Sequence, residues 1–316
     1  MKKLYLLIFI IFLPIVNSDN LRVITSSGIT DGYKKNNVIR WDDIPYAKPP
    51  IGELRWKAPR KILNDSSLIE KKDNNFCMQR TSSLGGSAQF SDKDISGTED
   101  CLYLDIIAPS NMSNKSLPVM FWIHGGGNTS GLKDLYNFTK LVKKHDVIVV
   151  RINYRLGPFG WFTHPAIQDL QEGLDKTSNF GTLDIIAALK WVKENISLFG
   201  GDSENITIFG ESAGGHNVLS LLVSNQAKGL FNKAISMSGY TTTILPQDAY
   251  KPKNESNTSS YSSWEVVNKV IRNKSYEKEQ NNLSNQEIRD ILYSLSEEEF
   301  YKLYSQRESY EEIPLL

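Results

Sequence analysis

The chain has 316 residues, with 36 basic and 36 acidic side chains, so its formal net charge at pH 7 is zero. No basic run or patch points to nucleic acid as a partner. Hydrophobic residues make up 40% of the sequence, which is ample for a folded core.

Residues 1–18 are typical of a secretory signal peptide. Two lysines follow Met1, residues 4–16 form an apolar run, and small or polar residues end it at Ser18. The run is too short to span a bilayer comfortably, so a cleaved leader is favoured over a signal anchor. Later in the sequence no segment is apolar for long enough to cross a membrane. We therefore expect a secreted protein that keeps no integral membrane segment, with one domain over residues 19–316.

Residues 19–60 predict short strands and turns, because prolines punctuate this stretch. The two cysteines, Cys77 and Cys101, follow it. The segment between them is rich in Ser, Gly and Asp and cannot build a core of its own. A disulfide is therefore favoured over two free buried thiols, and it fits an oxidising compartment.

A glycine motif follows the apolar run of residues 117–121. The sequence Trp-Ile-His-Gly-Gly-Gly occupies residues 122–127, so His124 stands directly before three glycines. Main-chain N–H groups must approach an oxyanion closely, and glycine leaves room for that approach. A Gly triplet can also be only a flexible loop, but its place at a strand end favours an oxyanion hole.

Strand and helix patterns alternate after the glycine motif. Residues 147–152 are rich in β-branched side chains, which predicts a buried parallel strand. Residues 185–196 keep apolar side chains at helical spacing, and Asp184 lies close to the start of that helix. This alternation predicts the α/β class, with a mostly parallel sheet and helices on both faces.

The most informative motif is Gly-Glu-Ser-Ala-Gly at residues 210–214. It follows an apolar run and precedes a helix-compatible run at residues 218–223. Strand, sharp turn and helix around Gly-x-Ser-x-Gly form the nucleophile elbow of serine hydrolases. Such a turn strains the backbone of Ser212, and a Cβ at Gly210 or Gly214 would collide with a neighbouring strand or helix. The bare pattern also fits an ordinary Gly/Ser turn, so the preceding glycine motif adds weight.

Residues 234–239 predict the next strand, which would be left with an unpaired edge. The character of the sequence then changes. Residues 247–263 are polar and predict a loop, and amphipathic helices are predicted near residues 264–272 and 285–305. The best candidates for N-glycosylation lie in this region, at Asn254, Asn257, Asn273 and Asn282.

Five further motifs give the sequence a family likeness. They are Ile-Pro-Tyr-Ala-Lys-Pro-Pro at residues 44–50, Leu-Arg-Trp at 54–56, Glu-Asp-Cys-Leu-Tyr-Leu-Asp-Ile-Ile-Ala-Pro at 99–109, Ile-Asn-Tyr-Arg-Leu-Gly at 152–157 and Phe-Gly-Gly-Asp at 199–202. Together with the glycine motif and the elbow, they resemble the type B carboxylesterase family. That family includes cholinesterases, lipases and the non-catalytic neuroligins. The resemblance runs from Asp43 to Gly239.

The resemblance implies an α/β-hydrolase fold and a serine esterase. The family motif assigns the nucleophile to Ser212 and the oxyanion hole to the N–H groups of Gly126, Gly127 and Ala213. It also pairs the two cysteines. The partner would be a small-molecule ester, and we expect no cofactor and no metal ion.

The chain order in α/β-hydrolases is nucleophile, acid, histidine. The family's acid and histidine sit on strands beyond Leu316, so we expect an incomplete triad and a sheet that lacks its last strands. The only histidine after Ser212 is His216, one helical turn away. Because the elbow directs its hydroxyl away from its own helix, His216 is expected to be a packed helix residue and not the base. His124 is expected to position the glycines that follow it.

Several positions depart from the family pattern. Phe90 is the only aromatic residue between the cysteines, where choline esterases place a tryptophan for cation–π recognition. This argues against choline esters. Asn128 stands where the family usually has an aromatic residue, and Asp43 where a glycine is usual. By the same resemblance, candidate buried ion pairs join Arg55 with Glu99 and Arg155 with Asp184.

The sequence therefore predicts a secreted carboxylic ester hydrolase, represented by its N-terminal portion. The alternative is a catalytically inactive relative, either a neuroligin-like binding module or a truncated paralogue. The intact Ser212 and glycine motif favour descent from an active enzyme, whereas the missing histidine favours inactivity of the chain as written.

Overall fold

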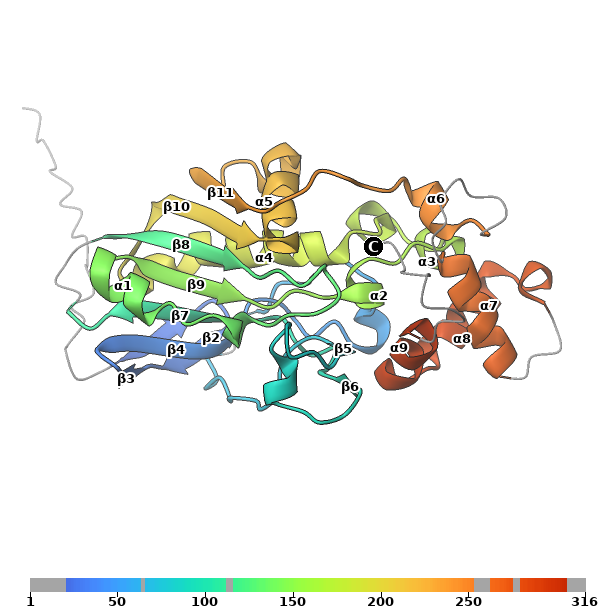
Figure 1. Ribbon diagram of the computed structural model, residues 1–316, viewed down its shortest axis with the longest axis horizontal. Helices are drawn as coiled ribbons and strands as arrows, with labels where there is room; N and C mark the ends of the chain where they lie inside the picture. The colour runs from blue at the N-terminus through green and yellow to red at the C-terminus, as the bar shows by residue number, and fades with distance from the viewer. Residues whose placement is uncertain (1–20, 64–65, 112–115, 253–261, 275–278, 306–316) are drawn as a thin grey trace, which may run out of the picture.

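A seven-stranded mixed sheet forms the centre of the molecule (Figure 1), in the strand order β11-β10-β8-β9-β7-β4-β3. The computed structural model describes residues 21–63, 66–111, 116–252, 262–274 and 279–305. The strands of this sheet are β3 (Tyr33–Lys35), β4 (Val38–Pro45), β7 (Tyr103–Pro109), β8 (Leu117–Ile123), β9 (Ile148–Ile152), β10 (Gly201–Glu211) and β11 (Lys233–Met237).

The sheet is parallel on one side and antiparallel on the other. Strands β9, β8, β10 and β11 run parallel to one another, whereas the pairs β9–β7, β7–β4 and β4–β3 are antiparallel. The predicted α/β class and mostly parallel sheet are thus confirmed. The strand predicted at residues 147–152 is parallel only to β8, because its other neighbour, β7, is antiparallel to it.

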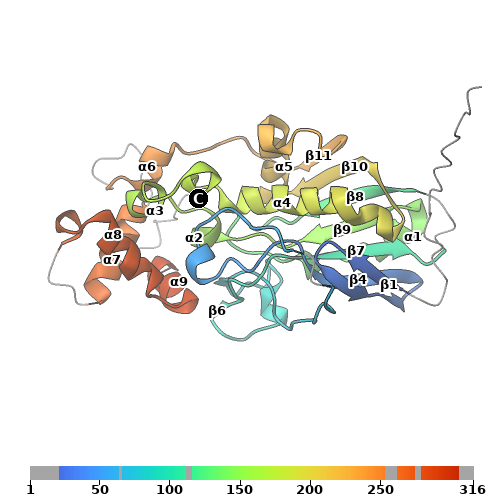
Figure 2. The same ribbon diagram turned by 180° about the vertical axis from the view of Figure 1, so that it is seen from behind.

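Helices cover both faces of the sheet, as Figures 1 and 2 show from opposite sides. Helix α1 (Thr139–His145) lies on one face, and α4 (Phe180–Asn195) and α5 (Ala213–Val223) lie on the other. Within β9, Val149 belongs to the apolar cluster that contains Val142 of α1, whereas Val150 belongs to the cluster that contains Leu189 of α4. Burial on both faces explains why this strand is an unbroken apolar run.

A helical cluster packs beyond the carboxyl ends of the parallel strands β8, β9, β10 and β11 (Figure 1). A second apolar core joins it to the rest of the chain, with Trp56, Phe162 and Phe300 in ring contact. Its helices are α2 (Gly157–Gly160), α3 (Pro165–Gln168), α7 (Ser263–Asn273), α8 (Asn285–Tyr293) and α9 (Glu297–Ser305). Further short elements include β1 (Arg22–Thr25), β2 (Gly28–Asp31), β5 (Gln79–Arg80), β6 (Ile95–Ser96) and α6 (Pro246–Tyr250).

Two predictions for the C-terminal region need correction. The single helix expected over residues 285–305 is two helices, because Ser296 starts a new capping box with Glu299. The Glu299 N–H donates to Ser296 Oγ at 3.2 Å, and the Ser296 N–H donates back to the Glu299 carboxylate at 2.9 Å. The loop expected over residues 247–263 begins inside α6, whose first position is the helix-compatible Pro246. The rest of that loop lies mostly outside the described residues.

Strand β11 forms one edge of the sheet, and no described strand pairs beyond it. All five of its residues are exposed, including Ile235 and Met237. The unpaired edge that the sequence predicts is therefore present among the residues that the structure describes. None of the described helices has the length and apolar character needed to cross a bilayer.

Both predicted ion pairs are present and buried. Arg55 donates to both carboxylate oxygens of Glu99, at 2.7 and 2.6 Å. Arg155 donates to both oxygens of Asp184, at 2.7 Å each. Arg55 also donates to the Leu295 carbonyl at 2.9 Å, so this pair ties the helical cluster to the segment that carries Glu99. Such bidentate ion pairs fix the relative positions of the segments that they join more than they add stability.

Cys77 and Cys101 form the predicted disulfide, with a Cα–Cα distance of 4.9 Å. The closed segment carries the β5–β6 hairpin. A bridge between residues 24 apart in sequence restricts the unfolded chain, which is the main source of disulfide stabilisation in the chain-entropy account.

Replacing both cysteines (Cys77→Ala with Cys101→Ala) is expected to lower the free energy of unfolding by about 3 kcal/mol. Urea denaturation measures this loss, and the unmodified protein in reducing buffer serves as the control because it should lose the same amount. Equal urea midpoints for the variant and the oxidised protein would show that the bridge contributes nothing.

Candidate active site

The elbow (residues 210–214) joins the end of β10 to the start of α5. Its Ser212 has φ 55° and ψ −122°, a strained region for a residue with a side chain, as the motif predicts. The Ser212 N–H donates to the Met237 carbonyl at 2.9 Å, and the Ser212 carbonyl accepts from the His216 N–H at 2.9 Å. The side chain is only partly buried, and its hydroxyl bonds to no described residue. The main chain is thus held while the hydroxyl stays free.

Main chain packs directly on main chain at the glycines of the elbow. A Cβ at position 214 would lie 2.1 Å from the Ile123 carbonyl oxygen. A Cβ at position 210 would lie 2.5 Å from the carbonyl of Gly214. Both collisions expected from the sequence are confirmed, and they explain why only glycine fits at these two positions.

Residues 124–131, the glycine loop, leave β8 beside the elbow. A Cβ at Gly125 would lie 3.2 Å from the Ser212 Cβ, so the loop contacts the serine itself. Gly126 and Gly127 have φ of 105° and 64°, values that favour glycine. The parallel pairing of Gly210 with Ile123 explains this meeting, because it ends β10 and β8 at the same edge of the sheet.

The Gly126 carbonyl fixes the direction of the next peptide group. It accepts from the Thr129 N–H at 3.1 Å, from the Ser130 N–H at 3.0 Å, and from both hydroxyls at 3.2 Å. In a trans peptide the C=O and the following N–H point in opposite directions. The Gly127 N–H therefore points out of this turn.

Three main-chain N–H groups near Ser212 have no hydrogen-bond acceptor among the described residues. Those of Gly126 and Gly127 have no acceptor among the described residues. Ala213 is the first residue of α5, so its N–H has no acceptor within the helix. Free N–H groups at a helix start and a glycine turn can bind a negatively charged oxygen.

His124 supports the glycine loop, as expected. It is fully buried, its Nδ1–H donates to the Gly125 carbonyl at 2.8 Å, and its ring stacks on Tyr154 at 4.4 Å between centroids. The Tyr154 hydroxyl donates to the His124 carbonyl at 2.7 Å. Burial lowers the pKa of His124 to about 4, so the ring is neutral at pH 7.

Asn128 ties the glycine loop to the helix that follows Ser212. Its side-chain oxygen accepts from Asn217 Nδ2 at 2.9 Å, and its carbonyl accepts from the Gly157 N–H at 2.7 Å. Asn217, which lies 89 residues from Asn128, is not among the site residues predicted from the sequence. Its only local signal is its place one residue after His216 on the buried side of α5. The φ of Asn128 is 56°, a conformation that asparagine tolerates better than the aromatic residue usual in the family.

His216 is packed away from the Ser212 hydroxyl, as expected. Its Nδ1 lies 2.6 Å from the Tyr240 carbonyl, and its ring stacks on the Tyr240 ring at 4.4 Å. His145 ends α1, and His164 caps α3 by accepting from the Ala166 N–H. No histidine in the described part of the chain bonds to the Ser212 hydroxyl.

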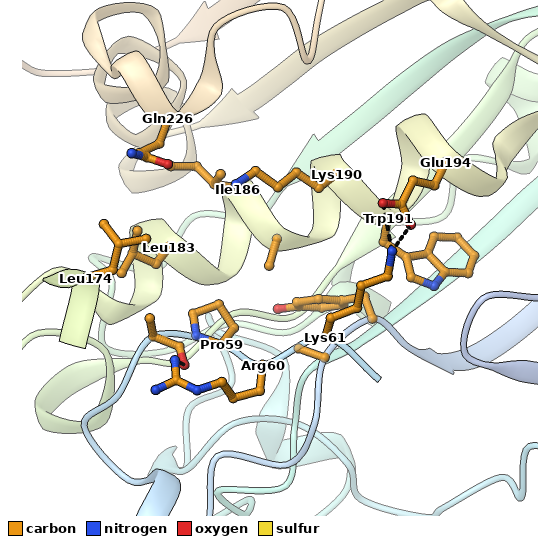
Figure 3. Close-up of a pocket in the computed structure, with 14 residues that line it drawn as sticks. Pro59, Arg60, Lys61, Leu174, Leu183, Ile186, Lys190, Trp191, Glu194 and Gln226 are labelled. Carbon is orange, nitrogen blue, oxygen red and sulfur yellow. Dashed lines mark hydrogen bonds and ion pairs between the residues drawn. The ribbon is translucent and has the colours of Figure 1, made fainter. Parts of the chain in front are cut away.

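The hollows among the described residues include a cavity beside the site and a cleft apart from it. A cavity of about 430 Å³ adjoins the site, with Asn128, His216 and Asn217 in its wall. A cleft of about 170 Å³ lies between α4 and the loop at residues 58–61 (Figure 3), with a Lys61–Glu194 ion pair at its rim. The cleft shares no residue with the elbow or the glycine loop and is not part of the site. Among the described residues, no group of acidic, His or Cys side chains could hold a metal ion.

Comparison with known proteins agrees with this geometry. Residues 19–312 match the model of the carboxylesterase family. The chain is 45% identical over 231 residues to para-nitrobenzyl esterase of Bacillus subtilis, covering 72% of this chain and 45% of the relative. It is 41% identical over 226 residues to juvenile hormone esterase of Tribolium castaneum, covering 70% and 36%.

A solved structure of a thermophilic PNB esterase superimposes with a TM-score of 0.71 at 36% identity, over 90% of this chain and 53% of the other. The Geobacillus stearothermophilus carboxylesterase Est55 gives a TM-score of 0.67 at 32% identity, over 90% and 54%. The fold is therefore that of the α/β-hydrolases. The chain spans about half the length, or less, of the relatives that it matches.

The neutral, buried His124 makes stability depend on pH. Its folded pKa of about 4 lies below the usual 6.5, so the unfolded chain takes up a proton first as the pH falls. The contribution of His124 to the free energy of unfolding should therefore be fully present above pH 6.5. As the pH falls through 4, the free energy of unfolding should decrease by about 3 kcal/mol because of this group.

Urea unfolding between pH 7 and 4 should show a shallower pH dependence for His124→Phe than for the unmodified protein. His164, whose pKa burial also lowers to about 4, stays in both proteins, so the difference isolates His124. Parallel pH curves for the two proteins would contradict a neutral His124.

Proposed function

Because the chain belongs to the carboxylesterase family, we propose that it is a serine hydrolase of carboxylic esters that works through an acyl-enzyme on Ser212. The Ser212 oxygen attacks the ester carbonyl, the alcohol leaves with a proton, and water then hydrolyses the acyl-serine. The N–H groups of Gly126, Gly127 and Ala213 would hold the oxyanion of both tetrahedral intermediates. The observation that carries this proposal is that all three lack an acceptor beside a strained, free serine.

The general base and its acid are proposed to come from outside the described residues. His216 is engaged by Tyr240, and His124 is buried, neutral and engaged by Gly125. The family order of nucleophile, acid and histidine supports a location in the part of the relatives that this chain does not span. The oxyanion hole alone leaves only a small share of the full rate, so we expect slow reaction from these 316 residues by themselves.

An inactive relative, either a neuroligin-like binding module or a truncated paralogue, is the second candidate. The observation that favours it is the absence of a described histidine on the Ser212 hydroxyl. A binding module, however, has no need for a strained serine or for uncommitted N–H groups beside it. The hydrolase is therefore the function that the geometry supports best.

We propose small-molecule esters as substrates, with para-nitrobenzyl and para-nitrophenyl esters as practical probes. Choline esters are not proposed, because the segment between the cysteines offers no tryptophan. Its single aromatic ring, that of Phe90, packs at 6.0 Å from the ring of Phe76.

We also propose that the protein is exported through the endoplasmic reticulum and secreted. The Cys77–Cys101 disulfide supports an oxidising compartment. The proposed signal peptide at residues 1–18 lies outside the described residues. Of the proposed glycosylation sites, Asn273 and Asn282 are exposed, and Asn254 and Asn257 lie outside the described residues.

A fluorophosphonate probe tests the proposed nucleophile. The purified protein should be labelled slowly at Ser212, and Ser212→Ala should abolish labelling. Ser220→Ala is the matched control, because Ser220 lies two turns further along the same helix and donates only to the His216 carbonyl. Labelling that persists in Ser212→Ala, or no labelling of the unmodified protein at any probe concentration, would reject the hydrolase and favour the inactive relative.

A further inference from the structure

We propose that Gln79 is a positioning residue for the glycine loop, through which the disulfide-closed segment sets the direction of the oxyanion-binding N–H groups. Gln79 has no role in the proposed chemistry and touches no reacting atom. The inference rests on the proposed function, because it concerns the N–H groups that the glycine loop would contribute to the oxyanion hole. It adds residues far from the elbow in sequence, which hold the glycine loop in place without contacting the reacting atoms.

The Gln79 side chain is fully buried and its amide is fully used. Its Nε2 donates to the Gly131 carbonyl at 2.9 Å and to the Cys77 carbonyl at 3.0 Å, and its Oε1 accepts from the Gly131 N–H at 2.9 Å. The side chain thus holds both main-chain groups of Gly131, as a neighbouring strand would. It links Gly131 to the cysteine that anchors the disulfide.

Gly131 closes the glycine loop on itself. Its φ is 116°, and a Cβ there would lie 2.4 Å from His124 Nδ1 and 2.5 Å from the Gly125 carbonyl oxygen. The last residue of the loop therefore packs against the first two. A shift of Gly131 would be transmitted to both ends of the loop.

Two contacts lead from Gly131 to the oxyanion-binding groups. Ser130, its covalent neighbour, donates its N–H to the Gly126 carbonyl at 3.0 Å, and a Cβ at Gly126 would lie 2.1 Å from the Ser130 carbonyl oxygen. The Gly126 carbonyl in turn fixes the opposite direction of the Gly127 N–H. Gln79 therefore acts on Gly127 through Gly131, Ser130 and Gly126.

Loss of the Gln79 amide should release this turn. No other described residue bonds to the main-chain groups of Gly131, so both would be left buried without partners. Leaving a buried polar group without a partner is unfavourable, which drives the loop toward conformations that expose it to water. The glycines of the loop offer little resistance to such a change.

Gln79→Met tests the proposal, because methionine keeps the length of the side chain and removes all three hydrogen bonds. Gln171→Met is the matched control: Gln171 is also buried, and its Nε2 donates to the Trp56 carbonyl at 3.0 Å, outside the glycine loop. Amide hydrogen exchange of peptides that cover residues 124–131 is measured by mass spectrometry. The rate of fluorophosphonate labelling at Ser212 is measured in parallel.

We expect faster exchange in the glycine loop of Gln79→Met but not of Gln171→Met. Labelling should slow by about tenfold or more, with less change in the apparent affinity for the probe, because the N–H groups act mainly on the transition state. Unchanged exchange in the loop would overturn the inference. Faster exchange with unchanged labelling would overturn the positioning role. If the unmodified protein is never labelled, the proposed function fails, whereas the exchange result still decides whether Gln79 holds the loop.

Gln79→Glu provides a second test should Gln79→Met fail to fold. A protonated carboxyl can still accept from the Gly131 N–H and donate to its carbonyl, whereas the ionised form faces two carbonyl oxygens. Burial favours the protonated form at neutral pH. The labelling rate of Gln79→Glu relative to the unmodified protein should therefore fall as the pH rises. A ratio that is independent of pH would contradict the proposal.

Discussion

The whole site depends on one close approach of main chain to main chain. The carbonyl of Ile123, at the end of β8, lies where any side chain at position 214 would have to begin, 2.1 Å from the Cβ position. The approach brings the loop after β8 against the turn after β10. Strand pairing makes it possible, because β8 and β10 are parallel neighbours and end at the same level. Because the residues at this approach are glycines without side chains, Ser212 and the glycine loop can come into contact.

Buried polar groups at both ends of the glycine loop hold it against the elbow. Two residues after the loop, Lys133 forms ion pairs with Asp43 and Asp105 at 2.8 and 3.0 Å. Burial alone would raise the pKa of Asp105, but Lys133 and Arg151 hold it at about 2, so the carboxyl stays charged. His124, by contrast, is kept neutral by burial. The glycine loop thus begins at the uncharged, buried His124 and is followed by the buried ion pairs of Lys133.

Local sequence was sufficient to predict the parts of the site that depend on local geometry. The strained backbone of Ser212 and the glycines around it follow from the shape of a strand–turn–helix. Asp43 stands where the family has glycine and has φ 62°, which shows how a family pattern can indicate a backbone conformation. The bidentate Arg55–Glu99 pair came from the resemblance, since no spacing rule joins residues 44 apart.

The features that the sequence could not predict depend on contacts between residues far apart in the chain. Others depend on local signals that favour different structures, such as a capping box within a stretch of helical apolar spacing. Gln79 meets Gly131 across 52 residues, and nothing in either segment signals the other. The antiparallel neighbour of β9 is set by the path of the chain and not by the composition of the strand. Helix α4 begins at Phe180, five residues before the predicted start, and Phe180 packs in the second apolar core, a contact that the local apolar spacing does not signal. The break at Ser296 depends on a capping box, a signal easily outweighed by apolar spacing.

Whether the free Ser212 faces three main-chain donors can be seen in a crystal structure of the fluorophosphonate adduct. We expect phosphorus bonded to Ser212 Oγ, with the phosphonyl oxygen about 2.7–3.1 Å from the nitrogens of Gly126, Gly127 and Ala213. A phosphonyl oxygen directed to solvent, with those N–H groups bonded elsewhere, would contradict this expectation.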